Sequence, residues 1–228
     1  MLWHREHLPD PLPPEPLEIA ALWLGEAVKR AGQPNPNAMV LATADAAGVP
    51  SARVVLCKQI VPHPGYLTFY TNYRSHKGQD LSANPRAAIV MYWDAMHRQV
   101  RIEGPVVRTS AAESDAYFAS RNWQSRIGAW ASHQSEPIDS RKALYRAVAA
   151  AALKLALPAP AEDEQQPDPG LSIPRPPHWG GFNLWAESVE LWVEGSARIH
   201  DRARWSRTLS AEADGFAPGP WSVARLQP

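Results

Sequence analysis

Cationic side chains crowd into the stretch ARIHDRAR at 197–204. In an extended strand, alternate side chains point to the same face. One face of this stretch would carry a row of basic side chains: Arg198, His200, Arg202 and Arg204. Aligned like charges repel one another unless an anion or a carboxylate offsets them. The spacing therefore indicates either an anion-binding site or a solvated edge whose charge is offset by Asp201 and nearby acids.

Further cations and hydroxyls lie at expected strand ends and helix starts. These residues are Arg53, Lys58, Thr71, Ser75, Lys77, Arg121 and Ser125. Arginine, lysine and hydroxyl side chains are the types that bind phosphate, although each of them alone is also typical of a solvated surface. The flat side chain of Trp192 either stacks on a planar ligand or covers the core.

The sequence carries no motif for covalent or metal chemistry. It contains no phosphate-cradling GxxxxGKS/T loop, no GxGxxG and no HExxH. The single cysteine, Cys57, lies in an apolar run, which favours an inert buried thiol over a nucleophile. We therefore expect neither covalent catalysis nor a metal site.

Composition limits the function classes. The 228 residues carry 23 Lys and Arg against 23 Asp and Glu, so no global positive field favours nucleic acid or an anionic membrane. A hydrophobic fraction of 45% with ten tryptophans is enough for a core. One cysteine fits a reducing compartment, and the chain has no signal-peptide core and no apolar run of roughly 20 residues. We expect a cytoplasmic protein that binds neither nucleic acid nor membrane.

The elements that must position these side chains are mostly short strands. β-rich runs separated by turn signals occur at 38–44, 51–60, 66–72, 87–93, 98–108, 180–185, 188–195, 197–205 and 221–226. Helical patterns occur at 16–32, 111–121 and 139–156, the second of them after a capping box of Ser110 and Glu113. The first helix is expected to bury Leu17, Ala20, Leu24, Ala27 and Val28. The fold class is mainly β, an antiparallel sheet or barrel with flanking helices.

Proline marks the boundaries. A proline-rich segment over 1–16 precedes a single domain expected over 17–228. Within that domain, the proline-rich and acidic stretch at about 158–177 is predicted to be a loop.

Read together, a series of short motifs resembles one family. They are NAMVLATAD, RVVLCK, FYTN, SHKG, RQVRIEG, YFASR, IGAWASHQS, WGGF, RIHDR and the terminal RLQP. Their order and approximate spacing are those of the pyridoxamine 5′-phosphate oxidases, and the resemblance covers 37–228. It implies an FMN-binding split β-barrel, with a homodimer that binds FMN at the subunit interface.

The resemblance also implies the cofactor contacts. They are Arg53, Val54, Val55, Leu56, Cys57, Lys58, Tyr70, Thr71, His76, Lys77, Gln99, Gln134, Ser135, Trp192 and Arg202. Cations and hydroxyls suit the FMN phosphate, and amides suit the edge of its ring. Strict alternation puts Arg53 and Lys58 on opposite faces, so one of them acts from a strand end or Lys58 serves a second ligand.

The substrate residues carried over from the family form a second set: Lys58, Tyr117, Arg121 and Ser125 for the phosphate, and Arg198 with His200 beside the pyridine ring as the catalytic pair. Tyr117 and Arg121 are four residues apart, on one face of the expected helix. Three positions in the segment after Arg121 depart from many relatives: Asn122, Trp123 and Arg126. His76 also stands where the family often has a more basic residue.

The activity implied is the FMN-dependent oxidation of pyridoxamine or pyridoxine 5′-phosphate to pyridoxal 5′-phosphate by dioxygen, with release of hydrogen peroxide. Two alternatives stay open. One is an FMN-dependent oxidase of another ring system, of the phenazine-pathway type. The other is a non-catalytic flavin-binding protein, which a pocket blocked by the segment NWQSR at 122–126 would favour.

Overall fold

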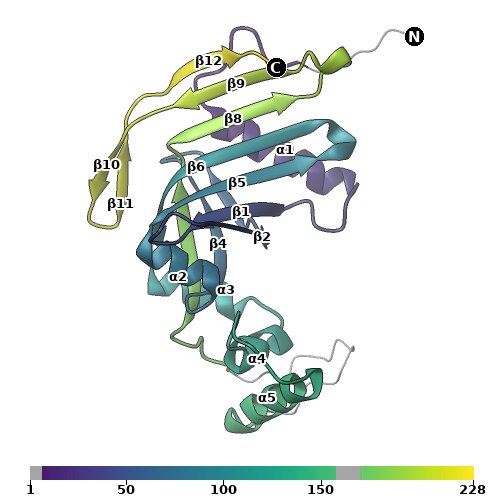
Figure 1. Ribbon diagram of the computed structural model, residues 1–228, viewed down its shortest axis with the longest axis vertical. Coiled ribbons are helices and arrows are strands. Elements are labelled where there is room, and N and C mark those ends of the chain that lie inside the picture. The colour runs from purple at the N-terminus through teal and green to yellow at the C-terminus, as the bar shows by residue number, and fades with distance from the viewer. Residues whose placement is uncertain (1–6, 158–169, 171) are drawn as a thin grey trace. The chain divides into compact units, whose positions relative to one another are not determined.

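The computed structural model describes residues 7–157, 170 and 172–228 (Figure 1). The chain forms two compact units. The first comprises the chain up to Phe69 together with Asp80–Val107 and Phe182–Pro228, and the second comprises Tyr70–Gln79 and Arg108–Gly181. The predicted loop over 158–177 lies mostly outside the described residues.

The first unit is built on an antiparallel sheet. Its strand order is β12 (Ser222–Leu226), β9 (Asp201–Ser206), β8 (Ser188–Val193), β6 (Arg98–Arg108), β5 (Arg86–Trp93), β1 (Ala38–Ala44) and β2 (Pro50–Leu56) (Figure 1). β3 (Gln59–Val61) pairs with β4 (Tyr66–Asn72), and β7 (Trp179–Trp185) pairs with β4 and β6. Burial alternates along β5 and β6, which places Ile89, Met91, Val100 and Ile102 in the core. The mainly β prediction is confirmed.

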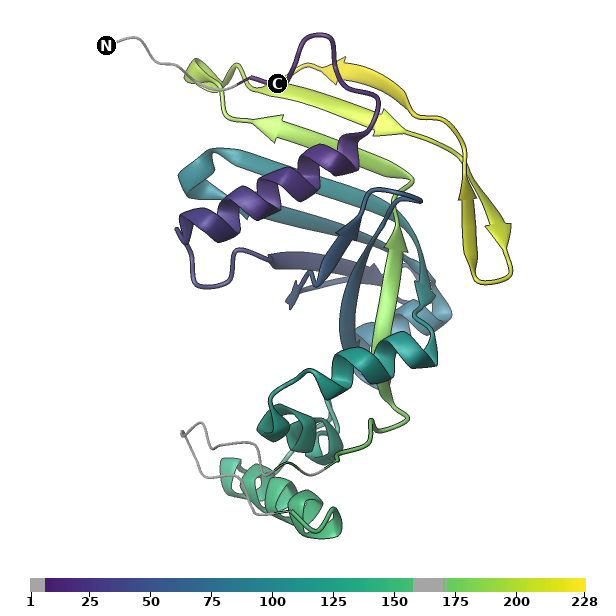
Figure 2. The same ribbon diagram turned by 180° about the vertical axis from the view of Figure 1, so that it is seen from behind.

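Helix α1 (Pro16–Arg30) lies across one face of this sheet (Figure 2). A proline at its start and a left-handed Ala31 at its end bound it much as the sequence indicated. Leu17, Ala20 and Ala27 are buried as predicted. Val28 is instead 54% exposed. The buried face of the helix includes Trp23, whose large ring takes the place expected for Val28.

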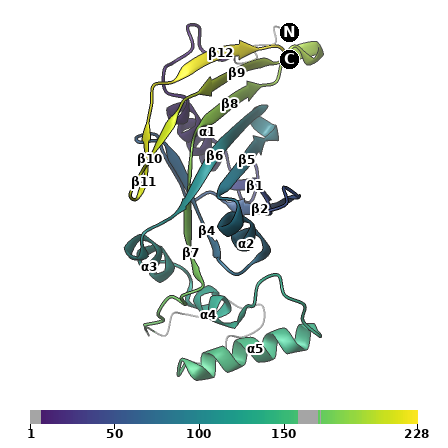
Figure 3. The same cartoon turned by 60° about the vertical axis from the view of Figure 1, so that its left-hand side comes forward.

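Helices dominate the second unit: α3 (Ala111–Ala119), α4 (Trp123–Ala131) and α5 (Arg141–Lys154) (Figure 3). The capping box of Ser110 and Glu113 at α3 is confirmed. Phe118, Trp123, Ile127 and Trp179 form the centre of this unit's apolar cluster. α2 (His76–Ala83) and α4 were not predicted, since each has an internal glycine and no long apolar repeat.

The structure corrects the strand predicted over 197–205. β9 begins only at Asp201, and Ser196–Arg198 form a short 3₁₀ turn in which Ala197 and Arg198 have φ of 52° and 65°. A Cβ at Gly195 would collide with the Ile199 carbonyl, so the chain folds back tightly just before the strand. Arg198 and His200 therefore do not share a strand face with Arg202, and the four-residue row was wrong.

Two other features of the sheet differ from the prediction. The strand predicted over 51–60 is divided into β2 and β3. A separate hairpin of β10 (Leu209–Glu212) and β11 (Gly215–Pro218), which no alternation signalled, follows β9.

Among the described residues, no helix is long and apolar enough to cross a membrane.

Candidate functional site

A buried lysine lies at the turn from β4 into α2, in the second unit. Lys77 is 8% exposed, and its Nζ donates hydrogen bonds to Thr71 Oγ1 at 3.1 Å, Ser75 Oγ at 3.0 Å and Gln134 Oε1 at 3.0 Å. The backbone N–H of His76 donates to Ser135 Oγ at 3.2 Å. The structure thus brings together five of the predicted cofactor residues around one ammonium group.

The local backbone explains why these side chains meet. Asn72 Nδ2 donates to the Ser132 carbonyl at 3.2 Å, which ties the end of β4 to the segment after α4 that carries Gln134. A Cβ at Gly78 would collide with the Tyr73 carbonyl, so only glycine lets the first turn of α2 pack this close to β4. A cation, hydroxyls and backbone N–H groups at a helix start are the donor set that binds phosphate.

A second group in the same unit surrounds Arg121. Its guanidinium lies 4.7 Å from the Trp179 ring centroid and 5.6 Å from that of Phe118. Nη1 is buried and has no hydrogen-bond partner among the described residues. Burial lowers the pKa of Arg121, the nearby charge of Arg126 lowers it further, and Tyr117 opposes both effects. A buried guanidinium N–H without an acceptor indicates an anionic ligand.

The predicted helical pairing of Tyr117 with Arg121 needs correction. α3 ends at Ala119, and Arg121 lies in the connection to α4, where Asn122 caps the next helix by accepting from Gln124 N–H at 2.8 Å. Because α3 ends two residues after Tyr117, Arg121 lies outside that helix. Ser125, on α4, is exposed.

In the first unit, three predicted cofactor residues lie side by side. The register pairs Gln99 on β6 with Trp192 on β8, and Trp192 with Arg202 on β9, so the three share one face of the sheet. His200 packs beside this strip, with its ring 4.7 Å from that of Trp192, and Tyr92 approaches Trp192 edge-on at 6.5 Å. The residues are half-buried except for Tyr92, which is exposed.

A carboxylate that the sequence analysis did not name offsets the cations of this strand. Glu190, 4% exposed on β8, accepts from Arg202 Nε and Nη2 at 3.1 and 2.8 Å and from Arg204 Nη2 at 3.1 Å, and lies 3.4 Å from Arg101 Nη1. Burial raises the pKa of Glu190, but the hydrogen bonds from Arg202 and Arg204, together with the charges of Arg202 and Arg101, outweigh it and the pKa is lowered. The signal in the sequence was a lone acid between Val189 and Leu191, on the strand before the cationic one.

The predicted cofactor segment over 53–58 runs along β2 and continues past the end of that strand at Leu56. Arg53 Nη1 donates to Thr43 Oγ1 at 2.7 Å, and Nη2 lies 3.7 Å from Asp80 Oδ2. Burial lowers the pKa of Arg53, and Asp80 opposes that shift. Cys57 is 2% exposed and its burial raises the pKa of the thiol to about 12, whereas Lys58 is exposed beyond the end of β2.

The predicted site residues divide between the two units. The first unit holds Arg53, Val54, Val55, Leu56, Cys57, Lys58, Gln99, Trp192, Arg198, His200 and Arg202. The second holds Tyr70, Thr71, His76, Lys77, Tyr117, Arg121, Ser125, Gln134 and Ser135. Within the first unit, Arg198 is exposed in its turn, apart from the group around Trp192.

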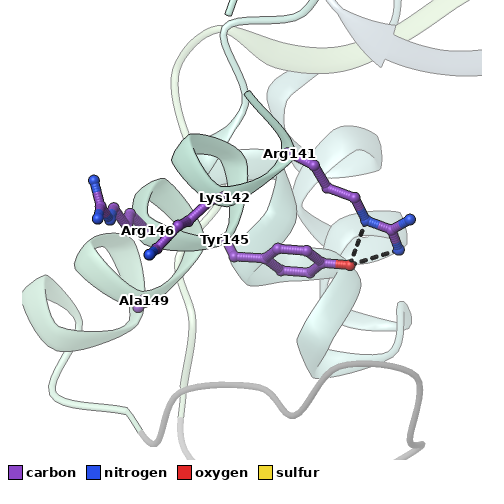
Figure 4. A pocket seen from close by; sticks show the side chains of 5 residues that line it. All are labelled: Arg141, Lys142, Tyr145, Arg146 and Ala149. Atoms are coloured by element: carbon purple, nitrogen blue, oxygen red, sulfur yellow. Dashed lines mark hydrogen bonds between the residues drawn. The ribbon is translucent and has the colours of Figure 1, made fainter. Parts of the chain in front are cut away.

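A pocket on α5 is separate from these groups. It is lined by residues of that helix: Arg141, Lys142, Tyr145, Arg146 and Ala149 (Figure 4). Arg141 donates from Nε and Nη2 to Tyr145 Oη at 3.0 and 2.8 Å. The cations that line the pocket are exposed, as on a solvated helix face, and the pocket contains no predicted site residue.

Comparison with known proteins identifies the family. Residues 25–154 match the family model described as pyridoxamine 5′-phosphate oxidase, and residues 179–228 match the pyridoxine 5′-phosphate oxidase C-terminal dimerisation region. Curated relatives named pyridoxine/pyridoxamine 5′-phosphate oxidase include one from Burkholderia orbicola, 46% identical over 94% of this chain and 90% of its own, and one from Paracoccus denitrificans, 42% identical over 94% and 95%.

Solved structures confirm the predicted split-barrel fold. PhzG from Burkholderia lata, crystallised with tetrahydrophenazine-1-carboxylic acid, is similar with a TM-score of 0.79, 28% identity and coverage of 96% of this chain and 95% of its own. A pyridoxamine 5′-phosphate oxidase-related, FMN-binding protein from Nostoc punctiforme has a TM-score of 0.65 at 18% identity, covering 93% and 97%. The matches together span nearly the whole chain, and this protein belongs to the pyridoxamine 5′-phosphate oxidase family.

Proposed function

We propose that this protein uses FMN to oxidise pyridoxine or pyridoxamine 5′-phosphate to pyridoxal 5′-phosphate, with dioxygen as the final acceptor and release of hydrogen peroxide. With the amine substrate the reaction also consumes water and releases ammonia. The observation that carries the proposal is identity of 42–46% to oxidases of that name over 94% of the chain. The side-chain chemistry supports it, because both units carry cations where phosphate-bearing ligands are expected.

The residues around Lys77 fit the FMN phosphate. The ammonium group of Lys77 donates hydrogen bonds to three neutral oxygen atoms. They orient it and do not neutralise its positive charge. Hydroxyls of Thr71 and Ser135 complete a donor set suited to a phosphate dianion. Gln99, Trp192 and Arg202 are the further flavin contacts that we infer, because an amide, a flat ring and a guanidinium share one sheet face there. When bound, FMN supplies the acceptor for the two electrons and the hydrogen lost from C4′ of the substrate.

The residues around Arg121 fit the substrate phosphate. Its buried Nη1 needs an acceptor, and a phosphate oxygen supplies one. Tyr117, Ser125 and Lys58 are the further phosphate ligands that we infer. Arg198 and His200 would orient the pyridine ring, and no nucleophile is required of the chain. The protein thus contributes binding and orientation, which are worth most when the reacting atoms are held at about 3–3.5 Å.

We infer that the protein works as a homodimer, because residues 179–228 match a dimerisation region and carry Trp192, Arg198, His200 and Arg202. A second copy would then contribute to each site.

The likeness to PhzG supports a second candidate, an oxidase of another ring substrate. A ligand anchored by a phosphate distinguishes the two, because Arg121 offers a buried donor suited to a dianion.

The test adds pyridoxine 5′-phosphate or pyridoxamine 5′-phosphate to purified protein loaded with FMN, and measures pyridoxal 5′-phosphate and peroxide. Turnover of either substrate, with little turnover of unphosphorylated pyridoxine, is the expected result. Flavin binding without turnover would favour the non-catalytic alternative. Oxidation of a reduced phenazine carboxylate in place of both phosphates would favour the PhzG type.

A further inference from the structure

The Trp-Gly-Gly segment at 179–181 has no part in the function proposed so far. Trp179 is 7% exposed, and one of its neighbours is the Arg121 guanidinium at 4.7 Å. Its ring is also nearly parallel to those of Tyr70, at 5.5 Å and 9°, and Tyr117, at 6.1 Å and 7°. Tyr70 and Tyr117 stack on each other at 4.0 Å. One indole therefore adjoins two of the side chains inferred to hold the substrate phosphate, Arg121 and Tyr117.

The two glycines press this segment against its neighbours. A Cβ at Gly181 would lie 2.8 Å from Tyr70 Cε1 and 2.7 Å from Thr109 Cγ2, and one at Gly180 would collide with Tyr73 Oη. Only glycine permits such a close approach, so the backbone next to Trp179 packs directly against these neighbouring side chains.

The backbone at Trp179 is also tied to α3. The Trp179 carbonyl accepts from Arg175 Nη1 at 2.6 Å, and Arg175 Nε donates to Asp115 Oδ1 on α3 at 2.7 Å. α3 carries Tyr117, two residues after Asp115. Arg175 thereby links the backbone at Trp179 to the helix that carries Tyr117.

Arg121 needs a fixed neighbour to orient its side chain, because it lies outside any helix. It belongs to the connection between α3 and α4, and its buried Nη1 finds no acceptor among the described residues. A guanidinium stacks readily on an aromatic face, which fixes its plane and leaves its edge N–H groups free for a bidentate contact with phosphate.

We propose that Trp179 is a positioning residue that orients Arg121, and with it Tyr117, toward the phosphate of the substrate. This inference rests on the proposed function. It assigns to Trp179 no contact with the reacting atoms.

The principal variant is Trp179→Leu, which removes the aromatic face and keeps an apolar side chain. With pyridoxine 5′-phosphate we expect the KM to rise about tenfold or more while kcat changes less, because an oriented charged contact to the phosphate is lost. Equilibrium binding of pyridoxal 5′-phosphate, followed by dialysis, should weaken by a similar factor. FMN content should stay normal.

The matched control is Trp130→Leu. Trp130 packs against the same apolar cluster, and it donates from Nε1 to the Pro174 carbonyl at 2.8 Å, which is not part of a predicted site residue. The control should lose thermal stability comparable to Trp179→Leu and keep its KM. If Trp179→Leu does not fold, Trp179→Phe supplies the test, since a smaller ring should still raise the KM about two- to threefold.

Two comparisons separate positioning from mere packing. Trp179→Leu should leave the low kcat/KM for unphosphorylated pyridoxine unchanged, and it should add nothing in an Arg121→Met background, because one interaction cannot be lost twice. Equal losses with both substrates, or full additivity with Arg121→Met, would overturn the role of Trp179 alone. A wild-type protein that neither oxidises nor binds the phosphorylated compounds would overturn the proposed function itself.

Discussion

Replacing Glu190 by glutamine tests why the chain places three arginines together. The carboxylate is 4% exposed and interacts with Arg202, Arg204 and Arg101. Glutamine keeps the shape and one carbonyl acceptor but removes the charge. The three guanidinium groups would then repel one another with no carboxylate between them.

The size of the effect follows from burial. Removing one partner of a fully buried ion pair costs about 3–5 kcal/mol. Here the partners are partly solvated, since the side chains of Arg202, Arg204 and Arg101 are 25%, 45% and 36% exposed, and the two more exposed pairs contribute little. Hydrogen bonds between Arg202 and a charged acceptor therefore dominate, and we expect a loss of about 2–3 kcal/mol. For a chain of this length that lowers the Tm by about 4–12 °C.

The pH dependence provides the second measurement. The pKa of Glu190 is lower in the folded protein than its ordinary value of 4.5, so its contribution to stability is complete above pH 4.5 and disappears as the pH falls through the folded-state pKa. The difference in free energy of unfolding between wild type and Glu190→Gln should be largest near pH 7 and should shrink below pH 4.5. Flavin fluorescence should also show weaker FMN binding, because Arg202 is no longer held.

Glu103→Gln is the control, since this carboxylate is 44% exposed and pairs with Arg101 at 2.6 Å. Its loss should cost less than about 1 kcal/mol. A Glu190→Gln variant that unfolds like the Glu103→Gln control, or a difference from wild type that is equal at pH 7 and pH 4, would refute the reasoning.

Four further substitutions address the ligand sites. Lys77→Met should weaken FMN binding about tenfold or more, measured by flavin fluorescence titration, whereas Lys142→Met on the exposed face of α5 should not. Arg121→Ala should raise the KM for pyridoxine 5′-phosphate with flavin still bound; flavin loss without unfolding would contradict this assignment. Arg202→Ala should lower FMN occupancy, whereas Arg198→Ala should keep FMN and lower kcat and kcat/KM together; identical behaviour of the two variants would contradict their separate roles.

The sequence predicted the parts of the fold that depend on local pattern. β1 and β6 have the expected bounds because each is a β-rich run bounded by turn signals, and the capping box at Ser110 is formed as expected. Alternation failed at 197–200, where the backbone is set by the close approach of Gly195 to Ile199. That contact depends on a turn with positive φ, which neither propensity nor periodicity encodes.

The candidate site was predictable in its residue types and less so in its connections. Resemblance supplied Lys77, Gln134 and Arg121, and the structure places the first two in direct contact. It did not supply Glu190 or Trp179, because each acts through an arginine and reveals itself only when strands or loops are brought together.

The cations that opened the analysis thus divide into two kinds. Arg202 and Arg204 share a buried carboxylate, so their repulsion is offset within the protein and they need no ligand in order to be stable. Arg121 is different, because its buried Nη1–H has no acceptor among the residues that the structure describes, and its desolvation cost is not offset by a hydrogen bond from them. Since the chain as a whole carries equal numbers of acidic and basic residues, this local excess is not part of a general positive charge. An anion bound there would supply the missing acceptor and stabilise the protein, and we propose that the phosphate of the substrate is that anion.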